Sequence, residues 1–146
     1  MKRIILLFVS LFVVSSLVWA DNDKPIQVSE MPADAQQFIK THFAGQAVAV
    51  AKVEKDFFSK SYDVIFTNGN KVEFDKSGKW TNVDCKYSQV PVAIIPAQIK
   101  NYVSKYYKNA KVVQIELNDR KGYEIELNNG LEIEFDKNFK VIDIDK

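Results

Sequence analysis

Closely spaced carboxylates in the last part of the sequence are the residues best placed to do chemistry. Aspartate and glutamate occupy alternate positions in three short runs, with apolar residues between them. Side chains at alternate positions of a strand share one face of the sheet, so the three runs would form one acidic face. It contains Glu124, Glu126, Glu132, Glu134, Asp143 and Asp145.

Crowded carboxylates repel one another, and a cation relieves the repulsion. The cation can be a lysine from elsewhere in the chain, which leaves a solvated acidic surface, or it can belong to a basic partner. A third alternative is calcium, which accepts clustered carboxylates with flexible geometry. That site would comprise Glu124, Glu126, Glu132 and Glu134. No EF-hand spacing or comparable ligand loop is present, so no metal or other cofactor is assigned and calcium stays the alternative.

Catalytic groups other than carboxylates are few. His42 is the only histidine and falls on the apolar stripe of a predicted helix, which favours packing over catalysis. No serine lies in a nucleophile elbow, and no glycine-rich phosphate loop occurs. A flat face of carboxylates also lacks the environment that separates an acid from a base. The sequence therefore predicts a protein that is not an enzyme.

A repeated stretch must position the carboxylates. Residues 62–84, YDVIFTNGNKVEFDKSGKWTNVD, return as residues 123–145, YEIELNNGLEIEFDKNFKVIDID. Each copy reads as three strands joined by two tight turns, and the shared NG and EFD-K elements fall at equal spacing. Such self-similarity predicts one structural unit built twice.

The first turn of each copy fixes the strand register. A three-residue loop with Gly130 in the left-handed conformation sets Ile125 against Ile133 and keeps the apolar side chains on one face. Glu126 then lies opposite Glu132. For the second turn we expect a two-residue loop, as at Ser77-Gly78, which pairs Phe74 with Thr81 and Phe135 with Ile142.

A helix precedes the strands of each copy. Apolar residues recur every three or four positions from Pro32 to Gly45 and again from Pro96 to Tyr107. A strand follows each helix, over 48–54 and 112–118, whereas residues 21–28 read as a loose lead-in. We therefore predict an α+β fold of two tandem α-β-β-β-β repeats. Their antiparallel sheet has up to eight strands, the helices on one face and the other face open.

The first copy carries fewer charges and more apolar residues on the open face. The predicted register places Ile65 and Trp80 there, and Phe57 and Phe58 lie in an insertion. Exposed aromatic residues are typical anchors of protein interfaces. Trp80, Ile65, Phe57 and Phe58 are therefore the predicted partner-binding residues, with the alternative that Phe57 and Phe58 fold back over the sheet.

The amino terminus is typical of a secretory signal peptide. Residues 1–3 are basic, residues 4–18 are almost wholly apolar, and Val18-Trp19-Ala20 precedes a polar run. We predict a signal peptide over 1–20, a first repeat over 21–88 and a second over 89–146, with a membrane anchor as the alternative for 1–20. Cys85 is the only cysteine, which excludes an intramolecular disulfide. We expect it to be a small apolar residue at a strand end, with a redox or intermolecular role as the alternative.

Composition sets broad limits on partners. The 146 residues carry a formal net charge of +1, with 47% hydrophobic and 27% charged residues. This is the profile of an ordinary globular domain, and it does not favour a nucleic-acid partner.

The helix openings MPADAQQFIKTHF and IPAQIKNYVSKYY, followed by the NG hairpin and the EFD-K turn, resemble the PepSY-like family of periplasmic proteins of gut Bacteroidetes. The resemblance implies a fold like that of the beta-lactamase inhibitor protein, in which an open sheet face and loops clasp an enzyme. The sequence thus predicts a secreted, periplasmic binding module for a protein or peptide, and more specifically an inhibitor of a hydrolase. The alternative is a calcium-binding or calcium-responsive envelope protein.

Overall fold

The computed structural model describes residues 22–146, so the signal peptide predicted for residues 1–20 lies outside the described residues. The helices are α1 (Ala33–His42) and α2 (Ala97–Tyr106), each preceded by a short 3-10 turn, η1 (Val28–Glu30) and η2 (Val92–Ile94). The strands are β1 (Asp23–Ile26), β2 (Val48–Lys55), β3 (Lys60–Phe66), β4 (Lys71–Asp75), β5 (Trp80–Asp84), β6 (Val112–Asn118), β7 (Gly122–Leu127), β8 (Glu132–Phe135) and β9 (Val141–Asp145).

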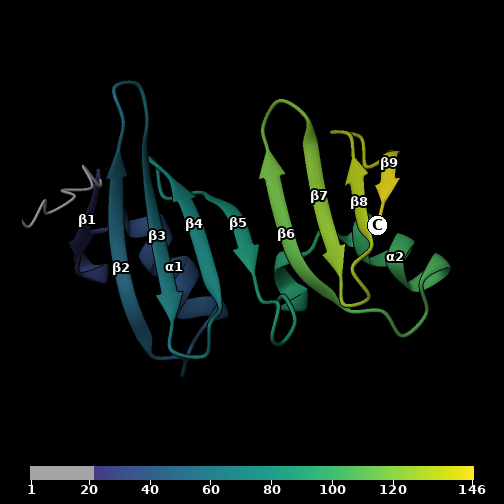
Figure 1. The fold of residues 1–146 in the computed structure, drawn as a ribbon, viewed down its shortest axis with the longest axis horizontal. Coiled ribbons are helices and arrows are strands. Elements are labelled where there is room, and N and C mark those ends of the chain that lie inside the picture. The colour runs from purple at the N-terminus through teal and green to yellow at the C-terminus, as the bar shows by residue number, and fades with distance from the viewer. Residues whose placement is uncertain (1–21) are drawn as a thin grey trace, which may run out of the picture.

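The strands form one antiparallel sheet in chain order from β1 to β9. Both helices lie behind the same face of this sheet, α1 behind the strands of the first half and α2 behind those of the second half (Figure 1). The opposite face is open. The predicted α+β fold with an open antiparallel sheet is therefore confirmed, and a direct pairing of β5 with β6, with Val83 opposite Ile115, joins the two halves.

The ninth strand was not expected. Residues 23–26 form β1 and pair with β2, Ile26 lying opposite Ala51. The predicted loose lead-in is therefore wrong over these residues. Ile26 packs against the core, and Pro25, which has no N–H to donate, is tolerated because β1 is an edge strand.

Helix α1 packs on the sheet through Ala35 and Ile39, and α2 packs through Ile99 and Val103, all of them buried. Directly after α1, Phe43 stacks on Phe66 of β3 with 4.9 Å between the ring centroids. The apolar spacing of each helix thus explains which face it buries.

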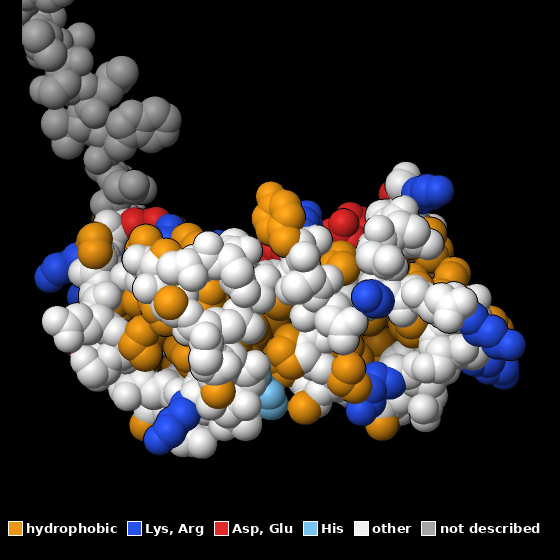
Figure 2. Space-filling view, turned by 90° about the horizontal axis from the view of Figure 1, so that it is seen from below, with side chains coloured by type: hydrophobic (Ala, Val, Ile, Leu, Met, Phe, Trp, Pro, Cys, Tyr) orange, Lys and Arg blue, Asp and Glu red, His pale blue; other side chains and the backbone are white. Residues whose placement is uncertain are grey.

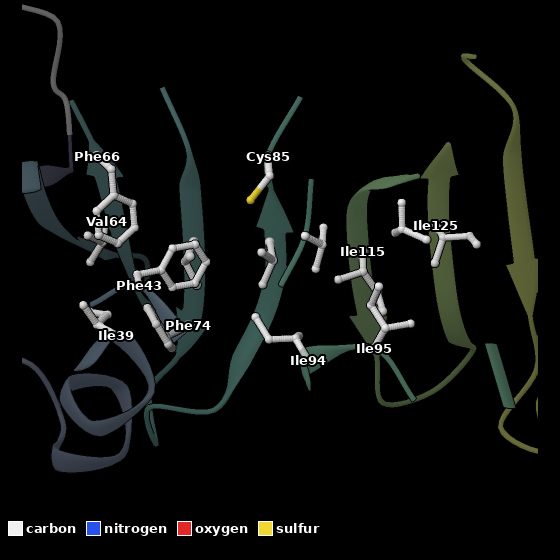
Figure 3. Packing of buried hydrophobic residues seen from close by; sticks show 14 of the residues in the cluster. Ile39, Phe43, Val64, Phe66, Phe74, Cys85, Ile94, Ile95, Ile115 and Ile125 are labelled. Atoms are coloured by element: carbon white, nitrogen blue, oxygen red, sulfur yellow. The ribbon is translucent and has the colours of Figure 1, made fainter. Parts of the chain in front are cut away.

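Residues between the halves make the core continuous. Ile94 and Ile95, just before α2, lie between β5 and β6 together with Cys85, which follows β5 (Figure 3). These side chains belong to the same buried cluster as Phe43 and Ile125. One hydrophobic core therefore underlies both halves of the sheet.

The first turn of each half follows the predicted geometry. Gly69 and Gly130 adopt positive φ angles of 88° and 82°. The Gly130 N–H donates to the Leu127 carbonyl, and the Leu127 N–H donates to the Leu131 carbonyl. The resulting register pairs Ile125 with Ile133 and places both in the core.

The second turn differs from the prediction. The Asp75 N–H donates to the Lys79 carbonyl, so the loop has three residues, with Gly78 in the left-handed region at φ 91°. Phe74 consequently lies opposite Trp80, not Thr81. The equivalent turn behaves alike, and Phe135 lies opposite Val141, not Ile142. A three-residue loop ending in a left-handed residue adds one residue to the returning strand as a bulge.

Candidate functional site

The open face of the second half is covered with carboxylates. Strand pairing places Glu116 opposite Glu124, Glu124 opposite Glu134, and Glu134 opposite Asp143. A second row contains Glu126, Glu132 and Asp145. We call these seven side chains the acidic face: Glu116, Glu124, Glu126, Glu132, Glu134, Asp143 and Asp145.

The acidic face has few cations of its own. Within residues 22–146, its one ion pair joins Lys86 Nζ to Glu126 Oε2 at 3.4 Å. The visible acidic side chains in Figure 2 gather along the upper rim, away from the histidine of α1 that marks the helix side. Most of the carboxylates of the acidic face therefore depend on solvent or on a partner for compensation.

The first half of the same sheet face is compensated by its own lysines. Lys71 Nζ lies 3.1 Å from Asp63 Oδ2 and 2.5 Å from Glu73 Oε1. Lys52 lies on the other side of Asp63, at 3.6 Å, and also pairs with Asp23. Each of the two lysines thus contacts two carboxylates.

The two halves differ at the positions that flank the central carboxylate. Lys52 lies opposite Asp63 on one side, and Lys71 lies diagonally on the other. Around Glu124, these two positions are taken by Glu116 and Glu132. Two positions that carry lysine in the first half therefore carry glutamate in the second half, which makes the second half the more acidic.

A small hollow of about 70 Å³ opens at the upper end of the acidic face. Three carboxylates and one lysine line it, together with Gly122 and the apolar Ile142; the charged residues are Glu116, Glu124, Glu134 and Lys121. No side chain larger than hydrogen fits at Gly122, because an added Cβ would lie 2.2 Å from the Phe135 carbonyl oxygen. The hollow combines carboxylates with apolar surface, which suits the end of a lysine or arginine side chain.

The surroundings of Glu124 in the hollow oppose its ionisation, whereas those of Lys71 in the first half favour its ionisation. Partial burial raises the pKa of Glu124, and the negative charges of Glu116, Glu134 and Glu132 raise it further, while Lys121 lowers it. In the first half, burial would lower the pKa of Lys71, but hydrogen bonds to Glu73 and Asp63 outweigh it and raise that pKa. Like charges thus repel one another on the acidic face, whereas opposite charges attract one another on the open face of the first half.

The raised pKa of Glu124 predicts a pH-dependent stabilisation. Replacing Glu124 with glutamine is expected to raise the free energy of unfolding at pH 7 by about 0.5 kcal/mol, the size of a like-charge cross-strand pair. The native state binds this proton more tightly than the unfolded state, so the penalty disappears as pH falls through the raised pKa. The gain should therefore shrink to nothing below the ordinary value of 4.5.

Urea denaturation of the Glu124→Gln variant at pH 7 and pH 4 measures both effects. Asp34→Asn, which removes an exposed carboxylate from the first turn of α1 and so breaks no like-charge pair across strands, is the control and should give no gain at either pH. An equal gain from Glu124→Gln at both pH values would contradict the assignment.

One of the predicted partner-binding residues, Trp80, does not lie on the open face. Trp80 lies opposite Phe74 on the helix side, and its ring centroid is 6.3 Å from that of Phe38 in α1. The prediction that Trp80 is exposed on the open face is therefore wrong, because the bulged turn adds one residue before β5. Ile65 does lie on the open face, half-buried beside Val50 and Lys71.

Phe57 and Phe58 lie apart from the open face. They occupy the tip of the β2–β3 hairpin, and their exposed fractions are 97% and 102%. The alternative that they fold back over the sheet is therefore wrong. The structure does not bring them together with Trp80 or with the acidic face.

The two candidate catalytic side chains are both packed. The ring of His42 lies against Phe38 with 4.7 Å between centroids. Cys85 is fully buried, and burial raises the pKa of its thiol to about 11, with a smaller contribution from Asp84. A protonated, buried thiol is a poor nucleophile, so Cys85 acts as a small apolar residue of the core.

Sequence reasoning missed Glu116 and Gly122. Glu116 alternates with Ile115 and Leu117 in the strand before the repeated hairpin, so alternation alone could have placed it on the acidic face. No signal in the sequence marks Gly122, because the backbone that requires a glycine there belongs to β8 and lies more than ten residues further along the chain.

Comparison with known proteins places these features in a family. A family model described as "Putative beta-lactamase-inhibitor-like, PepSY-like" matches residues 60–143. No curated protein matches the chain. Within residues 22–146, no helix has the length and hydropathy needed to cross a membrane.

Three solved structures from Bacteroides share the fold. A "putative periplasmic protein from DUF2874 family" of Bacteroides vulgatus ATCC 8482 is 61% identical, with a TM-score of 0.84 over 87% of this chain and 99% of that chain. A "putative calcium-regulated periplasmic protein" of Bacteroides thetaiotaomicron gives the same values. A "putative periplasmic protein of unknown function" of Bacteroides vulgatus ATCC 8482 is 39% identical, with a TM-score of 0.79 over 85% of this chain and 99% of that chain.

The family match spans more than half of the chain, over strands β3 to β9 and helix α2, and the structural matches extend it across the rest of the described fold. The chain therefore belongs to the PepSY-like, beta-lactamase-inhibitor-like family.

Proposed function

We propose that the protein is a secreted, periplasmic binding module without enzymatic activity, which recognises a basic protein or peptide through the acidic face. The observation that carries the proposal is the contrast within one sheet. Two lysines form ion pairs with three carboxylates on the open face of the first half, whereas the seven carboxylates of the acidic face have one ion pair within the described residues.

Recognition would use the strand geometry of the acidic face. Its carboxylates lie in rows across neighbouring strands, with strands about 4.8 Å apart. Lysine or arginine side chains of a partner can lie along a row and form charge-assisted hydrogen bonds. One such side chain would enter the hollow and place its stem against Ile142. Such pairing favours basic partners over acidic ones and speeds their association.

Two further observations support the setting. The related solved structures are described as periplasmic, and residues 1–20 have the basic, apolar and small segments of a signal peptide. The inhibitor-like description of the family supports a protein partner. A periplasmic or secreted hydrolase with basic residues near its active site is one partner of this kind.

Calorimetric titration with an arginine-rich peptide tests the proposal. We expect binding that weakens as salt is added, and an affinity about tenfold lower for the Glu124→Gln/Glu134→Gln variant. Asp34→Asn, which removes an exposed carboxylate on the helix side, is the control and should change the affinity by less than twofold. Equal affinities for all three proteins, or no heat with the native protein, would refute recognition by the acidic face.

Calcium binding is a second candidate, favoured by the printed description of the Bacteroides thetaiotaomicron structure as calcium-regulated. Glu124, Glu126, Glu132 and Glu134 would supply the oxygen ligands. Across residues 22–146, no three ligating side chains are already grouped to hold a metal ion, so these glutamates would have to move together. Calorimetric titration with calcium chloride and thermal denaturation test this candidate. No heat of binding and no rise in Tm at millimolar calcium would exclude it.

A further inference from the structure

The tip of the β2–β3 hairpin projects two aromatic side chains into solvent. Phe57 and Phe58 are the most exposed large apolar residues of the described chain, and their rings contact little besides each other, with 6.5 Å between centroids. The loop is ordered by its own hydrogen bonds. The Asp56 N–H donates to the Ser59 carbonyl, and the Phe57 N–H donates to the Asp56 side chain. Both rings are therefore exposed at the tip of the hairpin, which extends beyond its neighbours at the upper end of the sheet (Figure 1).

Basic residues are frequent at the end of the sheet that carries this tip. Four turns, β2–β3, β4–β5, β6–β7 and β8–β9, meet at the same end of the antiparallel sheet, the upper end in Figure 1. They and the adjoining strand ends contain Lys55, Lys60, Lys76, Lys79, Arg120, Lys121, Lys137 and Lys140. The turns at the opposite end, over 43–47, 67–70, 85–90, 107–111 and 128–130, and the adjoining strand ends contain half as many basic residues, Lys71, Lys86, Lys108 and Lys111.

Three carboxylates at the upper end accept hydrogen bonds from their own turns or pair with a lysine. Asp75 accepts hydrogen bonds from the Ser77 and Lys79 N–H groups, and Asp136 accepts them from Asn138 and Lys140. Asp119 pairs with Lys79 at 2.9 Å. These acids shape the turns and leave the end of the sheet with an excess of positive charge.

A basic hollow lies directly beside the aromatic tip. Lys24, Lys55 and Lys60 line it, with Tyr62 and Glu30 among its other walls, and its volume is about 180 Å³. Glu30 accepts a hydrogen bond from the Gln27 N–H and so helps to cap η1. The hollow can therefore offer lysine ammonium groups to an anionic group next to the rings.

We propose that this end of the sheet docks on an anionic phospholipid surface, with Phe57 and Phe58 inserted among the lipids and the surrounding lysines on the headgroups. Aromatic side chains favour the interface between water and lipid, and lysines near an anionic surface add electrostatic attraction. Two features favour lipid over a protein partner. The rings project from a convex tip, whereas protein hot spots lie within a well-packed patch, and the cations spread over four turns at one end of the sheet.

Sedimentation with lipid vesicles tests the proposal, using the processed chain from residue 21, which contains the whole described structure. We expect the protein to sediment with phosphatidylglycerol vesicles and not with phosphatidylcholine vesicles. Phe57→Ser/Phe58→Ser and Lys55→Gln/Lys60→Gln should each weaken binding about tenfold, and salt should weaken it further. Tyr87→Ser, which removes a side chain that is 87% exposed at the opposite end, is the control and should have no effect.

Two outcomes would overturn the proposal. One is the absence of binding to phosphatidylglycerol vesicles. The other is undiminished vesicle binding by Phe57→Ser/Phe58→Ser; if that variant also loses the basic peptide, the tip is a protein contact. Because the tip is separate from the acidic face, the proposed peptide recognition can fail while lipid binding succeeds, and the reverse.

Discussion

Replacing Glu116 and Glu132 with lysine is expected to abolish most of the affinity for a basic peptide while raising the Tm. The variant gives Glu124 the two flanking lysines that Asp63 already has in Lys52 and Lys71. Affinity should fall about 100-fold, because two attractive charges become repulsive. The Tm should rise by several degrees, because like charges no longer face each other across the strands.

Calorimetry and thermal denaturation measure the two effects of the Glu116→Lys/Glu132→Lys variant. Glu30→Lys/Asp34→Lys changes the net charge equally on the helix side and is the control, for which we expect a loss of only a fewfold. If the control loses as much affinity as the test variant, net charge explains the binding and the arrangement of the acidic face does not.

Replacing Gly122 with alanine is expected to destabilise the protein by about 3 kcal/mol or more. Gly122 has a φ of 123°, which side chains rarely adopt, and the added Cβ would lie 2.2 Å from the Phe135 carbonyl oxygen and 2.6 Å from the Asp136 carbonyl carbon. Both neighbours are backbone atoms, so β8 must move away from β7 to relieve the clash. The hollow at the acidic face would change with it.

Urea denaturation compares this variant with Gly45→Ala. Gly45 also has a positive φ, at 80°, but an added Cβ there would meet nothing within 4 Å. Its expected loss is about 1 kcal/mol, the usual cost of the left-handed conformation for a residue with a side chain. Equal losses at the two glycines would show that the close approach of β8 does not determine the stability of this region.

The sequence was informative wherever one face of an element is buried. The helical spacing predicted the buried faces of α1 and α2, and the alternation around Gly130 predicted the register that sets Glu126 opposite Glu132. A shift of one residue would bury the glutamates, so the core itself selects the register. The acidic face follows directly from that selection.

The second turns and β1 were not predictable in the same way. Gly78 and Phe139 both occupy the left-handed region, at φ 91° and 61°. Phenylalanine gives no turn signal at the second of these turns, and at the first Ser77-Gly78 also suits a two-residue loop, so neither turn indicated the extra residue that sets the position of Trp80. Strand β1 has only four residues and includes Pro25, a residue that argues against a strand.

The conformation of the insertion could not be read from its composition. The strands β2 and β3 extend so far along it that only residues 56–59 form the loop, which leaves Phe57 and Phe58 at the tip. Whether adjacent aromatic residues fold back or project depends on how far the backbone pairing continues. That pairing is set by contacts along the whole hairpin, including Lys55 opposite Lys60.

Mapping an arginine-rich peptide on the protein by amide chemical-shift changes tests recognition by the acidic face most directly. We predict that the changes concentrate in β6 to β9, around Glu116, Glu124 and Glu134, and that the strands containing Lys52 and Lys71 do not respond. Changes centred on β2 to β4, or no changes in β6 to β9 under conditions where the peptide binds, would contradict it.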